Sequence, residues 1–278
     1  MCQLLGMNSS KPAALGFSFE GFAERGGRTG EHKDGWGIAF HGADGCTLLT
    51  DQLASIDSPL AASLKRAPVK ATSVVAHIRK ATRGRVASEN THPFMRRLWG
   101  QTWSFAHNGD LADAPPEPAG QLAPFSPVGD TDSEQAFCFL LNGLQHRFAR
   151  QPPPTQLYHA VATLAADIAL GGSFNFLLSN GELLFAHCST HLHYVVREYP
   201  FTVARLIDCD ISINFSQHNH LDDRIAVIAT QPLTSNEAWI AFSPGQLKMF
   251  VGGEAVSPLA REPAPGEACA TRPQWRFA

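Results

Sequence analysis

The stretch TDSEQAFCFLLNGLQHRF, residues 131–148, decides the fold class that the sequence predicts. It opens with the pattern Thr-x-x-Glu at Thr131 and Glu134, whose side chains can reciprocally satisfy free N–H groups in the first turn of a helix. Apolar residues then recur at helical spacing and would share one face: Phe137, Leu140, Leu141, Leu144 and Phe148. A helix that packs by one face is therefore expected here.

A second helix is expected soon after the first. Residues 156–170 carry apolar side chains in helical register at Leu157, Val161, Leu164 and Ile168. Gly171 is a typical residue for ending such a helix. Three prolines at 152–154 separate the two helices. Because that connection is only a few residues long, we interpret it as an inter-helix turn and not as a linker between domains.

Short apolar segments on both sides of the two helices are typical of β-strands. They are bounded by Gly, Asn, Asp or Pro and are rich in β-branched and aromatic residues. The segments are residues 36–40, 73–78, 103–107, 174–178, 183–187, 192–196 and 225–229. Asn180-Gly181 predicts a hairpin with a two-residue turn. A parallel α/β fold would alternate strand and helix throughout, so this order favours an α+β fold with antiparallel sheets.

Composition argues against several classes of function. The chain has 278 residues, with 22 Lys and Arg against 25 Asp and Glu, and a net charge of −3. This balance argues against nucleic acid and against an anionic membrane surface as partners. No run approaches the roughly 18 consecutive apolar residues of a membrane-spanning helix. Residues 1–8 also lack the basic and apolar regions of a signal peptide.

The cysteines indicate a reducing compartment. They lie far apart without a C-x-x-C pair, a pattern that fits neither a zinc knuckle nor a disulfide framework. The six are Cys2, Cys46, Cys138, Cys188, Cys209 and Cys269. Cys46, Cys138, Cys188 and Cys209 have apolar neighbours and are interpreted as inert core thiols. A cytoplasmic protein is expected.

Cys2 differs from the other cysteines because it follows the initiator Met1. Methionine is usually removed when the next side chain is small. Removal would leave Cys2 with a thiol of pKa about 8.5 beside an α-amine of pKa about 7.7–8.0. Such a nucleophile carries its own base and needs no His partner. Position alone is equally compatible with Cys2 being simply a small residue.

Three further segments offer groups that an N-terminal nucleophile requires. Asn108-Gly109, at the end of a predicted strand, can point a side-chain amide and a backbone N–H at one oxyanion. Arg79 suits bidentate binding of a carboxylate, and Asp132, in the first helical turn, suits an ammonium group. Each of these residues is also compatible with a purely structural role. Asn108-Gly109 is typical of a tight turn, Arg79 of a surface ion pair and Asp132 of stabilisation of the helix dipole.

Together these segments resemble the class II glutamine amidotransferases, and most closely the stand-alone YafJ-like branch. The motifs occur in the family's order and rough spacing: Cys2, residues 34–37 (DGWG), Arg79-x-Ala81-Thr82, residues 90–94 (NTHPF), residues 107–109 (HNG) and residues 131–134 (TDSE). They cover residues 2 to about 140, and the segment 229–233 fits the rest of the same domain. Each motif is weak alone, whereas the ordered set behind a cysteine at position two is specific.

The resemblance implies the fold of the N-terminal nucleophile hydrolases. This is a four-layer αββα sandwich, in which two stacked antiparallel sheets lie between helical layers. One domain would span residues 2–255, and residues 256–278 would form an irregular Pro-rich tail.

The resemblance also implies a cofactor-free reaction. Cys2 would attack the γ-amide carbon of glutamine, and its own amino group would pass the proton to the departing ammonia. Asn108 Nδ2 and the Gly109 N–H would form the oxyanion hole. Water would then hydrolyse the γ-glutamyl thioester.

The resemblance further implies how the substrate is held, and the sequence departs from the family pattern there. Arg79 would bind the α-carboxylate, Thr82 would support that site and Asp132 would accept the α-ammonium. Lys80 and Arg83 replace a Trp and a His of the better-known pattern. Together with Arg79 and Arg85 they make the pocket rim more basic, so a γ-glutamyl compound with a second carboxylate is an alternative substrate.

Other expectations concern ammonia, metals and a loop. No domain after the amidotransferase domain is expected to receive ammonia, so either a partner protein accepts it or the enzyme simply hydrolyses a γ-glutamyl amide. A module that binds such a ligand without turnover is a further alternative. The His pairs at 191/193 and 218/220 lack a spaced Cys, Asp or Glu cluster, so no metal site is expected. Residues 26–30 are expected to form a mobile loop over the glutamine pocket, and His77, His92 and His107 to brace the site loops by hydrogen bonds.

Overall fold

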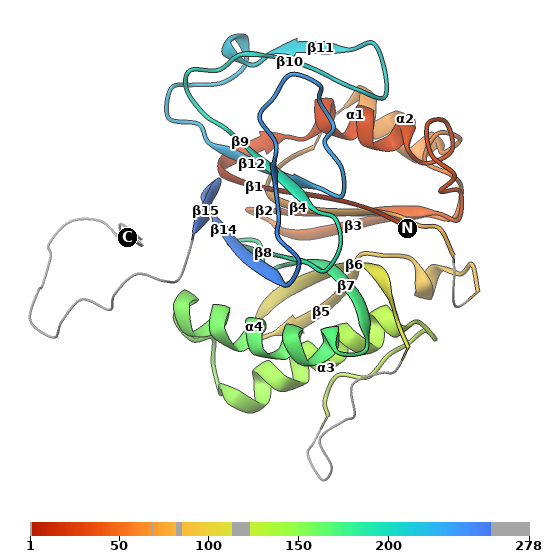
Figure 1. The fold of residues 1–278 in the computed structure, drawn as a ribbon, viewed down its shortest axis with the longest axis vertical. Coiled ribbons are helices and arrows are strands. Elements are labelled where there is room, and N and C mark those ends of the chain that lie inside the picture. The colour runs from red at the N-terminus through yellow and green to blue at the C-terminus, as the bar shows by residue number, and fades with distance from the viewer. Residues whose placement is uncertain (1, 68, 82–84, 113–122, 257–278) are drawn as a thin grey trace, which may run out of the picture.

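Two antiparallel sheets stack face to face in the computed structural model of this chain (Figure 1). The structure describes residues 2–67, 69–81, 85–112 and 123–256. Thr82, Arg83 and the predicted tail beyond Val256 lie outside the described residues. None of the described helices combines the length and hydrophobicity needed to span a bilayer.

The first sheet has seven strands, and β1 lies at its centre although it comes first in the chain. Every neighbouring pair is antiparallel. In sheet order the strands are β13 (Ile240–Ala241), β9 (His193–Arg197), β12 (Ile225–Ala229), β1 (Gln3–Ala14), β4 (Lys70–Ile78), β2 (Trp36–Gly42) and β3 (Gly45–Asp51).

The second sheet has six strands, again all antiparallel. In order they are β15 (Glu254–Val256), β14 (Gln246–Val251), β8 (Leu183–Cys188), β7 (Gly172–Ser179), β6 (Gln101–Leu111) and β5 (Phe94–Leu98). A separate two-stranded ribbon consists of β10 (Val203–Arg205) and β11 (Ser212–Asn214). Residues 180–182 join β7 to β8, so this hairpin loop is one residue longer than predicted.

Helices cover the outer face of each sheet (Figure 1). The seven-stranded sheet packs against α1 (Gly16–Glu24) and α2 (Pro59–Arg66), and the six-stranded sheet packs against α3 (Asp132–Arg147) and α4 (Pro154–Ala169). Two 3₁₀ turns, η1 (Ser88–Asn90) and η2 (Phe215–Gln217), lie in connections. The layers are helix, sheet, sheet, helix, so the predicted α+β sandwich is confirmed.

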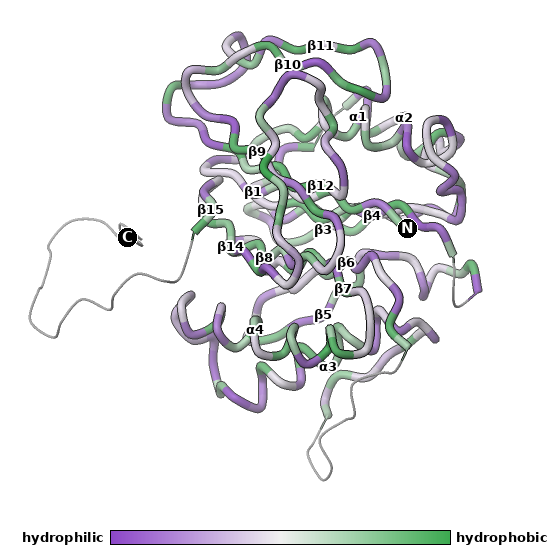
Figure 2. Tube along the Cα trace, viewed as in Figure 1, coloured by the Kyte–Doolittle hydropathy of each residue, from purple (hydrophilic) through white to green (hydrophobic). Residues whose placement is uncertain are grey.

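Strand periodicity creates the hydrophobic cores between these layers. Alternate side chains of β1 point to opposite faces, so Leu5 packs beneath α1 and α2 while Leu4 packs between the two sheets. On the other side, the ring of Phe137 in α3 stacks on that of Phe105 in β6, with centroids 5.0 Å apart. Figure 2 shows hydrophobic segments along the helices and along the strands in the middle of the molecule.

The cap of α3 forms only half of the predicted reciprocal pair. Thr131 Oγ1 accepts a hydrogen bond from Glu134 N at 3.2 Å, as expected. The Glu134 carboxylate instead accepts from the N–H groups of Val128 and Gly129 and pairs with Arg96 of β5. Glu134 therefore ties the incoming loop and the sheet edge to the helix start.

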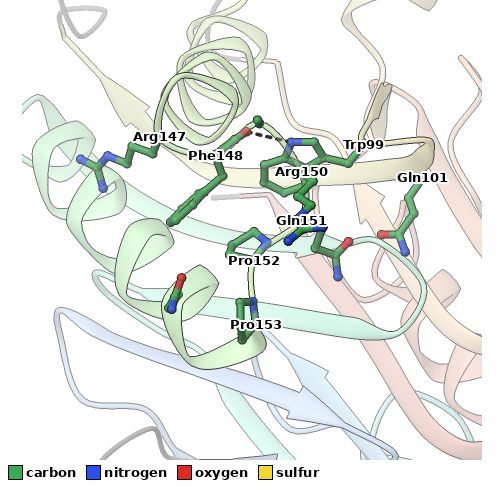
Figure 3. Close-up of a pocket in the computed structure, with 10 residues that line it drawn as sticks. Trp99, Gln101, Arg147, Phe148, Arg150, Gln151, Pro152 and Pro153 are labelled. Atoms are coloured by element: carbon green, nitrogen blue, oxygen red, sulfur yellow. Dashed lines mark hydrogen bonds between the residues drawn. The ribbon is translucent and has the colours of Figure 1, made fainter.

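The proline segment is an inter-helix connection, as predicted. Helix α3 ends at Arg147, and α4 begins at Pro154, two residues before the predicted start, because proline fits the first turn of a helix. In the connection, Phe148 O accepts from Trp99 Nε1 at 3.1 Å. Figure 3 shows Pro152 and Pro153 lining a groove beside these two residues.

Candidate active site

Cys2 lies at the mouth of the interface between the two sheets. It immediately precedes β1, where Gln3 pairs with Ile78 at the end of β4, so Cys2 adjoins Arg79 and Lys80. Its Sγ accepts a hydrogen bond from Lys80 N at 3.2 Å. Burial raises the pKa of the Cys2 thiol, while the Lys80 N–H and the Arg79 guanidinium act in the opposite direction. A base is therefore needed to form the thiolate at neutral pH.

Asn108 contacts the backbone of Cys2. Its side chain is buried, and Nδ2 donates to Cys2 O at 2.6 Å. A carboxamide nitrogen carries two hydrogens. The other protein acceptor near it, Thr230 Oγ1, is 3.5 Å away, longer than a normal hydrogen bond. The amide thus retains donor capacity beside Cys2.

Gly109 occupies a place that no other residue fits. A Cβ atom there would lie 1.9 Å from Ser173 O and 2.6 Å from His107 Nε2. Strand β5 pairs with β6 only as far as Phe105, so the Asn108-Gly109 backbone has no second strand neighbour on that edge of the sheet. The sequence predicted this pair of residues, and the structure places them beside Cys2.

Asn175 supports Asn108 and was missed by the sequence analysis. The two residues face each other in the β6–β7 register, and Asn175 Nδ2 donates to Asn108 O at 2.8 Å. Asn175 Oδ1 in turn accepts from Ser189 N and Thr190 N. Its signal in the sequence was a lone amide between two phenylalanines of an apolar strand. Such a residue requires buried partners.

Thr230 is a second supporting residue that was not singled out from the sequence. It follows β12, and its Oγ1 accepts from Leu4 N at 2.9 Å while its N–H donates to Leu4 O at 3.2 Å. These bonds extend the β1–β12 ladder toward Cys2. Thr230 therefore fixes the start of the strand that carries the thiol.

The motif at residues 34–37 holds the loop that contains Arg79. Arg79 N donates to Gly35 O at 2.9 Å, and Asp34 N donates to Arg79 O at 3.2 Å. The Asp34 carboxylate also accepts from Ala81 N. The Arg79 side chain is buried, and its Nη1 donates to Arg85 O at 3.1 Å. Arg79 therefore lies in a fixed position next to Cys2.

Two basic residues in the described part of the predicted rim pair with carboxylates. Lys80 forms an ion pair with Glu31 at 2.8 Å, and Arg85 forms one with Glu89 at 2.6 Å. In each pair one partner is largely exposed to solvent: Glu31 in the first and Arg85 in the second. Each carboxylate offsets one positive charge of the rim.

Asp132 lies at the start of α3, next to the end of β6. Its carboxylate accepts from Leu111 N at 2.9 Å and from Ser133 N at 2.8 Å. Leu111 is two residues beyond Gly109 on the same strand. The half-buried carboxylate thus belongs to the same end of the sheet as the Asn108-Gly109 pair. Thr82 lies outside the described residues.

The NTHPF and TDSE motifs are joined directly. Asn90 is buried, and its Nδ2 donates to Asp130 Oδ1 at 2.6 Å while its Oδ1 accepts from Asp130 N at 3.1 Å. Asp130 precedes the cap of α3. The loop after β4 is therefore tied to the helix that carries Asp132.

Of the three histidines near the site, one has the role expected and two do not. His107 braces the site, with Nδ1 2.8 Å from Ser133 Oγ and Nε2 3.1 Å from Ser173 O. His77 and His92 do not brace it. Their rings lie 4.3 Å apart, and their nitrogens are buried without a hydrogen-bond partner among the described residues. Burial lowers the pKa of His77 to about 3, so its ring is neutral.

Comparison with known proteins identifies the family. A model described as "Glutamine amidotransferases class-II" matches residues 1–273. The chain belongs to the class II glutamine amidotransferases. A relative named "Putative glutamine amidotransferase YafJ", from Escherichia coli K12, is 48% identical over 257 residues, covering 92% of this chain and all of that protein.

Solved structures of other amidotransferases resemble this one. The crystal structure of a "predicted glutamine amidotransferase" from Pseudomonas aeruginosa PA01 is 40% identical, with a TM-score of 0.73 over 92% of this chain and 100% of the other. The glutamine phosphoribosylpyrophosphate amidotransferase of B. subtilis matches with a TM-score of 0.57 at 15% identity, over 92% of this chain and 48% of its own. That second likeness concerns the fold alone.

Two remaining expectations concern this amidotransferase's metal content and its glycine-rich loop. In the part of the chain that the structure describes, no three His, Cys, Asp or Glu side chains are placed to hold a metal ion together. The loop at residues 26–30 lies near the site, because Glu31 at its end pairs with Gly26 and reaches Lys80. Its closure over glutamine stays a prediction.

Proposed function

We propose that the chain hydrolyses the γ-amide of glutamine through a γ-glutamyl thioester on Cys2. The observation that carries this proposal is the contact of 2.6 Å between Asn108 Nδ2 and Cys2 O. This contact supports the proposal because it puts a side-chain donor at the backbone of the residue that the sequence singles out. The adjacent Gly109, which admits no side chain, adds a backbone N–H at the same point.

In the proposed first step the Cys2 sulfur bonds to the γ-amide carbon. The thiol proton passes to the α-amine of Cys2, which is free once Met1 has been removed. As the carbon–nitrogen bond breaks, that proton moves to the leaving nitrogen, and ammonia departs. Water then attacks the thioester, giving glutamate and regenerating the thiol. Because burial raises the pKa of this thiol, the neighbouring amine is an essential base in the scheme.

The negative oxygen of each tetrahedral intermediate would accept hydrogen bonds from Asn108 Nδ2 and the Gly109 N–H. Removing one such donor typically lowers kcat about 10²–10³-fold. Arg79 would bind the substrate α-carboxylate, and Asp132 would accept its α-ammonium group. Thr82 is proposed to support the Arg79 site. The Arg79 and Asp132 assignments each use a charge opposite to that of the substrate group, on a residue held by the backbone contacts described above.

Labelling by a glutamine-mimicking diazo-ketone tests the proposal. Intact mass should show a chain without Met1 that gains one adduct, located on Cys2 by peptide mapping. The Cys2→Ala variant should gain none and should lack glutaminase activity. The matched variant Cys209→Ala, at another half-buried thiol, should behave as wild type. A correctly trimmed wild-type chain that gains no adduct and releases no ammonia would leave a binding module as the better description.

The described rim does not favour an acidic γ-glutamyl compound over glutamine, because Lys80 and Arg85 are each offset by a carboxylate. Glutamine is therefore the proposed substrate. The ammonia either leaves to solvent or passes to a partner protein. The proposal places the chain in the cytoplasm, where thiols stay reduced. Ammonia release from glutamine and from γ-glutamyl peptides, measured side by side, compares the two substrate classes.

A further inference from the structure

A cluster of soft donor atoms lies where the edge hairpins of the two sheets meet. In the seven-stranded sheet, His41 of β2 faces Cys46 of β3 in the ladder register. In the six-stranded sheet, Met95 of β5 faces Ser104 of β6. Cys46 Sγ is 3.6 Å from His41 Nε2 and 3.4 Å from Met95 Sδ. Two cross-strand pairs thus bring a thiol, an imidazole and a thioether together.

This cluster is separate from the proposed active site. Arg79, the neighbour of Cys2, is bonded to Gly35 at the start of β2, whereas His41 is six residues further along that strand. At about 3.3 Å per residue the two places are about 20 Å apart. The sequence analysis interpreted Cys46 as an inert core thiol. The structure shows it half-buried and lining an open groove together with His41.

We propose that Cys46, His41 and Met95 form a binding site for a soft monovalent cation, Cu(I). Thiolate and thioether ligands select Cu(I) over harder ions, and imidazole is a common companion ligand. The set offers two sulfurs and one nitrogen. A site for Zn²⁺ would require four ligands, typically thiolates and imidazoles in a tetrahedron.

The spacing of the donor atoms suits a three-coordinate ion. With metal–sulfur bonds of about 2.3 Å and a metal–nitrogen bond of about 2.0 Å, donors around one ion lie about 3.7–4.0 Å apart. The two separations observed from Cys46 Sγ, 3.6 Å to His41 Nε2 and 3.4 Å to Met95 Sδ, would have to widen by about 0.1 Å and about 0.6 Å, respectively. Met95 is half-buried, and a flexible methionine can make that adjustment.

The protonation state of His41 suits metal binding, whereas the Cys46 thiol must lose its proton to the metal. Burial lowers the pKa of His41 to about 4, so its ring is neutral and has a lone pair at pH 7. Burial raises the pKa of Cys46 to about 11, so the thiol releases one proton as the sulfur–copper bond forms. No electron is transferred in this step. The charged side chains that line the groove are Asp44, Arg97 and Glu182.

Ser104 competes for the same nitrogen. Its Oγ lies 2.8 Å from His41 Nε2, so the hydroxyl can donate to the lone pair that the metal would use. On metal binding this hydroxyl must turn away. Ser104→Ala should therefore bind Cu(I) at least as tightly as the parent chain, whereas loss of a true ligand should weaken binding.

Anaerobic competition for Cu(I) against a bathocuproine chelator tests the site. The full chain is used with Cys2→Ala, so that the other reactive thiol does not bind the ion. The parent should take one equivalent, Cys46→Ser should lose it, and Met95→Leu and His41→Phe should each bind at least about tenfold more weakly. Cys209→Ser is the matched control and should bind as the parent does.

X-ray absorption at the copper edge provides a second measurement, and circular dichroism checks that each variant is folded. Two sulfur neighbours and one nitrogen neighbour are expected. A single sulfur neighbour, or unchanged affinity in both Met95→Leu and His41→Phe, would mean that copper binds the thiol alone and would overturn the proposal. So would Zn²⁺ that displaces Cu(I) at equal concentration.

Discussion

At the residue scale, the site depends on one backbone position that has no space for a side chain. Gly109 lies on β6 between Asn108 and Leu111, whose N–H donates to Asp132, and a Cβ at Gly109 would meet the backbone oxygen of Ser173. A backbone oxygen cannot rotate away as a side chain can. Any larger residue at 109 must therefore displace β6 or β7, and with it the donors beside Cys2.

Gly109→Ala should fold with a lower free energy of unfolding, by about 1–3 kcal/mol as for other overpacked sites. Its glutaminase kcat should fall by at least the roughly 10²-fold expected for one misplaced oxyanion donor. Urea unfolding and ammonia release measure the two effects. Gly42→Ala is the matched control, because a Cβ there has no atom within 4 Å. A Gly109→Ala chain with wild-type kcat would contradict the assigned donor.

At the element scale, the position of Cys2 follows from the strand behind it. Strand β1 is hydrogen-bonded on both edges, by β4 and by β12, and Thr230 extends the second ladder to Leu4. The thiol therefore lies at the end of a rigid central strand and not on a free chain terminus. Rigid placement is what a nucleophile needs to meet a fixed oxyanion hole.

Thr230→Val should loosen this strand at nearly constant volume. It leaves the buried Leu4 N–H without its acceptor, which costs about 1–3 kcal/mol. We also expect a lower kcat, because β1 positions Cys2. Denaturant unfolding and glutaminase assays report the two effects. Thr163→Val, at an exposed residue of α4, is the control. It should change the free energy of unfolding by no more than about 0.5 kcal/mol and leave kcat unchanged.

Elements with clear local signals could be predicted from the sequence, and others could not. All seven predicted strands are present, and so are both long helices. Strand β1 was missed because its second half begins with the polar residues Ser9, Ser10 and Lys11, of which the last two are exposed. Helix α1 was missed because it contains two glycines, Gly16 and Gly21, and α2 because it is only eight residues long.

The residues proposed for the site were singled out from the sequence more completely than the residues that support them. Cys2, Asn108 and Gly109 were singled out by position and residue type, and the ordered family motifs contain all three. Asn175 and Thr230 act through contacts between residues 67 and 226 positions apart, respectively. No local pattern encodes such a contact. The two-sheet sandwich itself was implied by resemblance, since local periodicity does not determine which faces stack.

At the scale of the whole molecule, burial keeps several histidines neutral. Their rings lie in the layer between or beside the sheets, where burial lowers the pKa of His41 to about 4 and that of His77 to about 3. In the unfolded chain a histidine titrates near pH 6.5. Above that pH neither state is protonated. Below it, the unfolded chain binds protons that the folded chain cannot, so acid favours unfolding.

The free energy of unfolding should therefore fall as the pH drops below about 6.5. Each such histidine lowers the free energy of unfolding by about 1.4 kcal/mol for each pH unit below about 6.5. For His77 this decrease continues to about pH 3. His77→Phe should show a shallower slope between pH 6.5 and 5 in urea titrations. The exposed His218→Gln is the control. Identical slopes in wild type and His77→Phe would contradict the role of this ring.

The central place of β1 also affects how the chain matures on the ribosome. Leu5 pairs with Ala229, so the strand that bears the nucleophile is made 224 residues before one of its two neighbours. At about 5–20 residues per second, that partner emerges about 10–45 s later. The proposed mechanism requires removal of Met1, and during this interval the proposed oxyanion hole is not yet aligned with Cys2. On that mechanism the thiol is among the first groups to be synthesised and among the last to reach its working position.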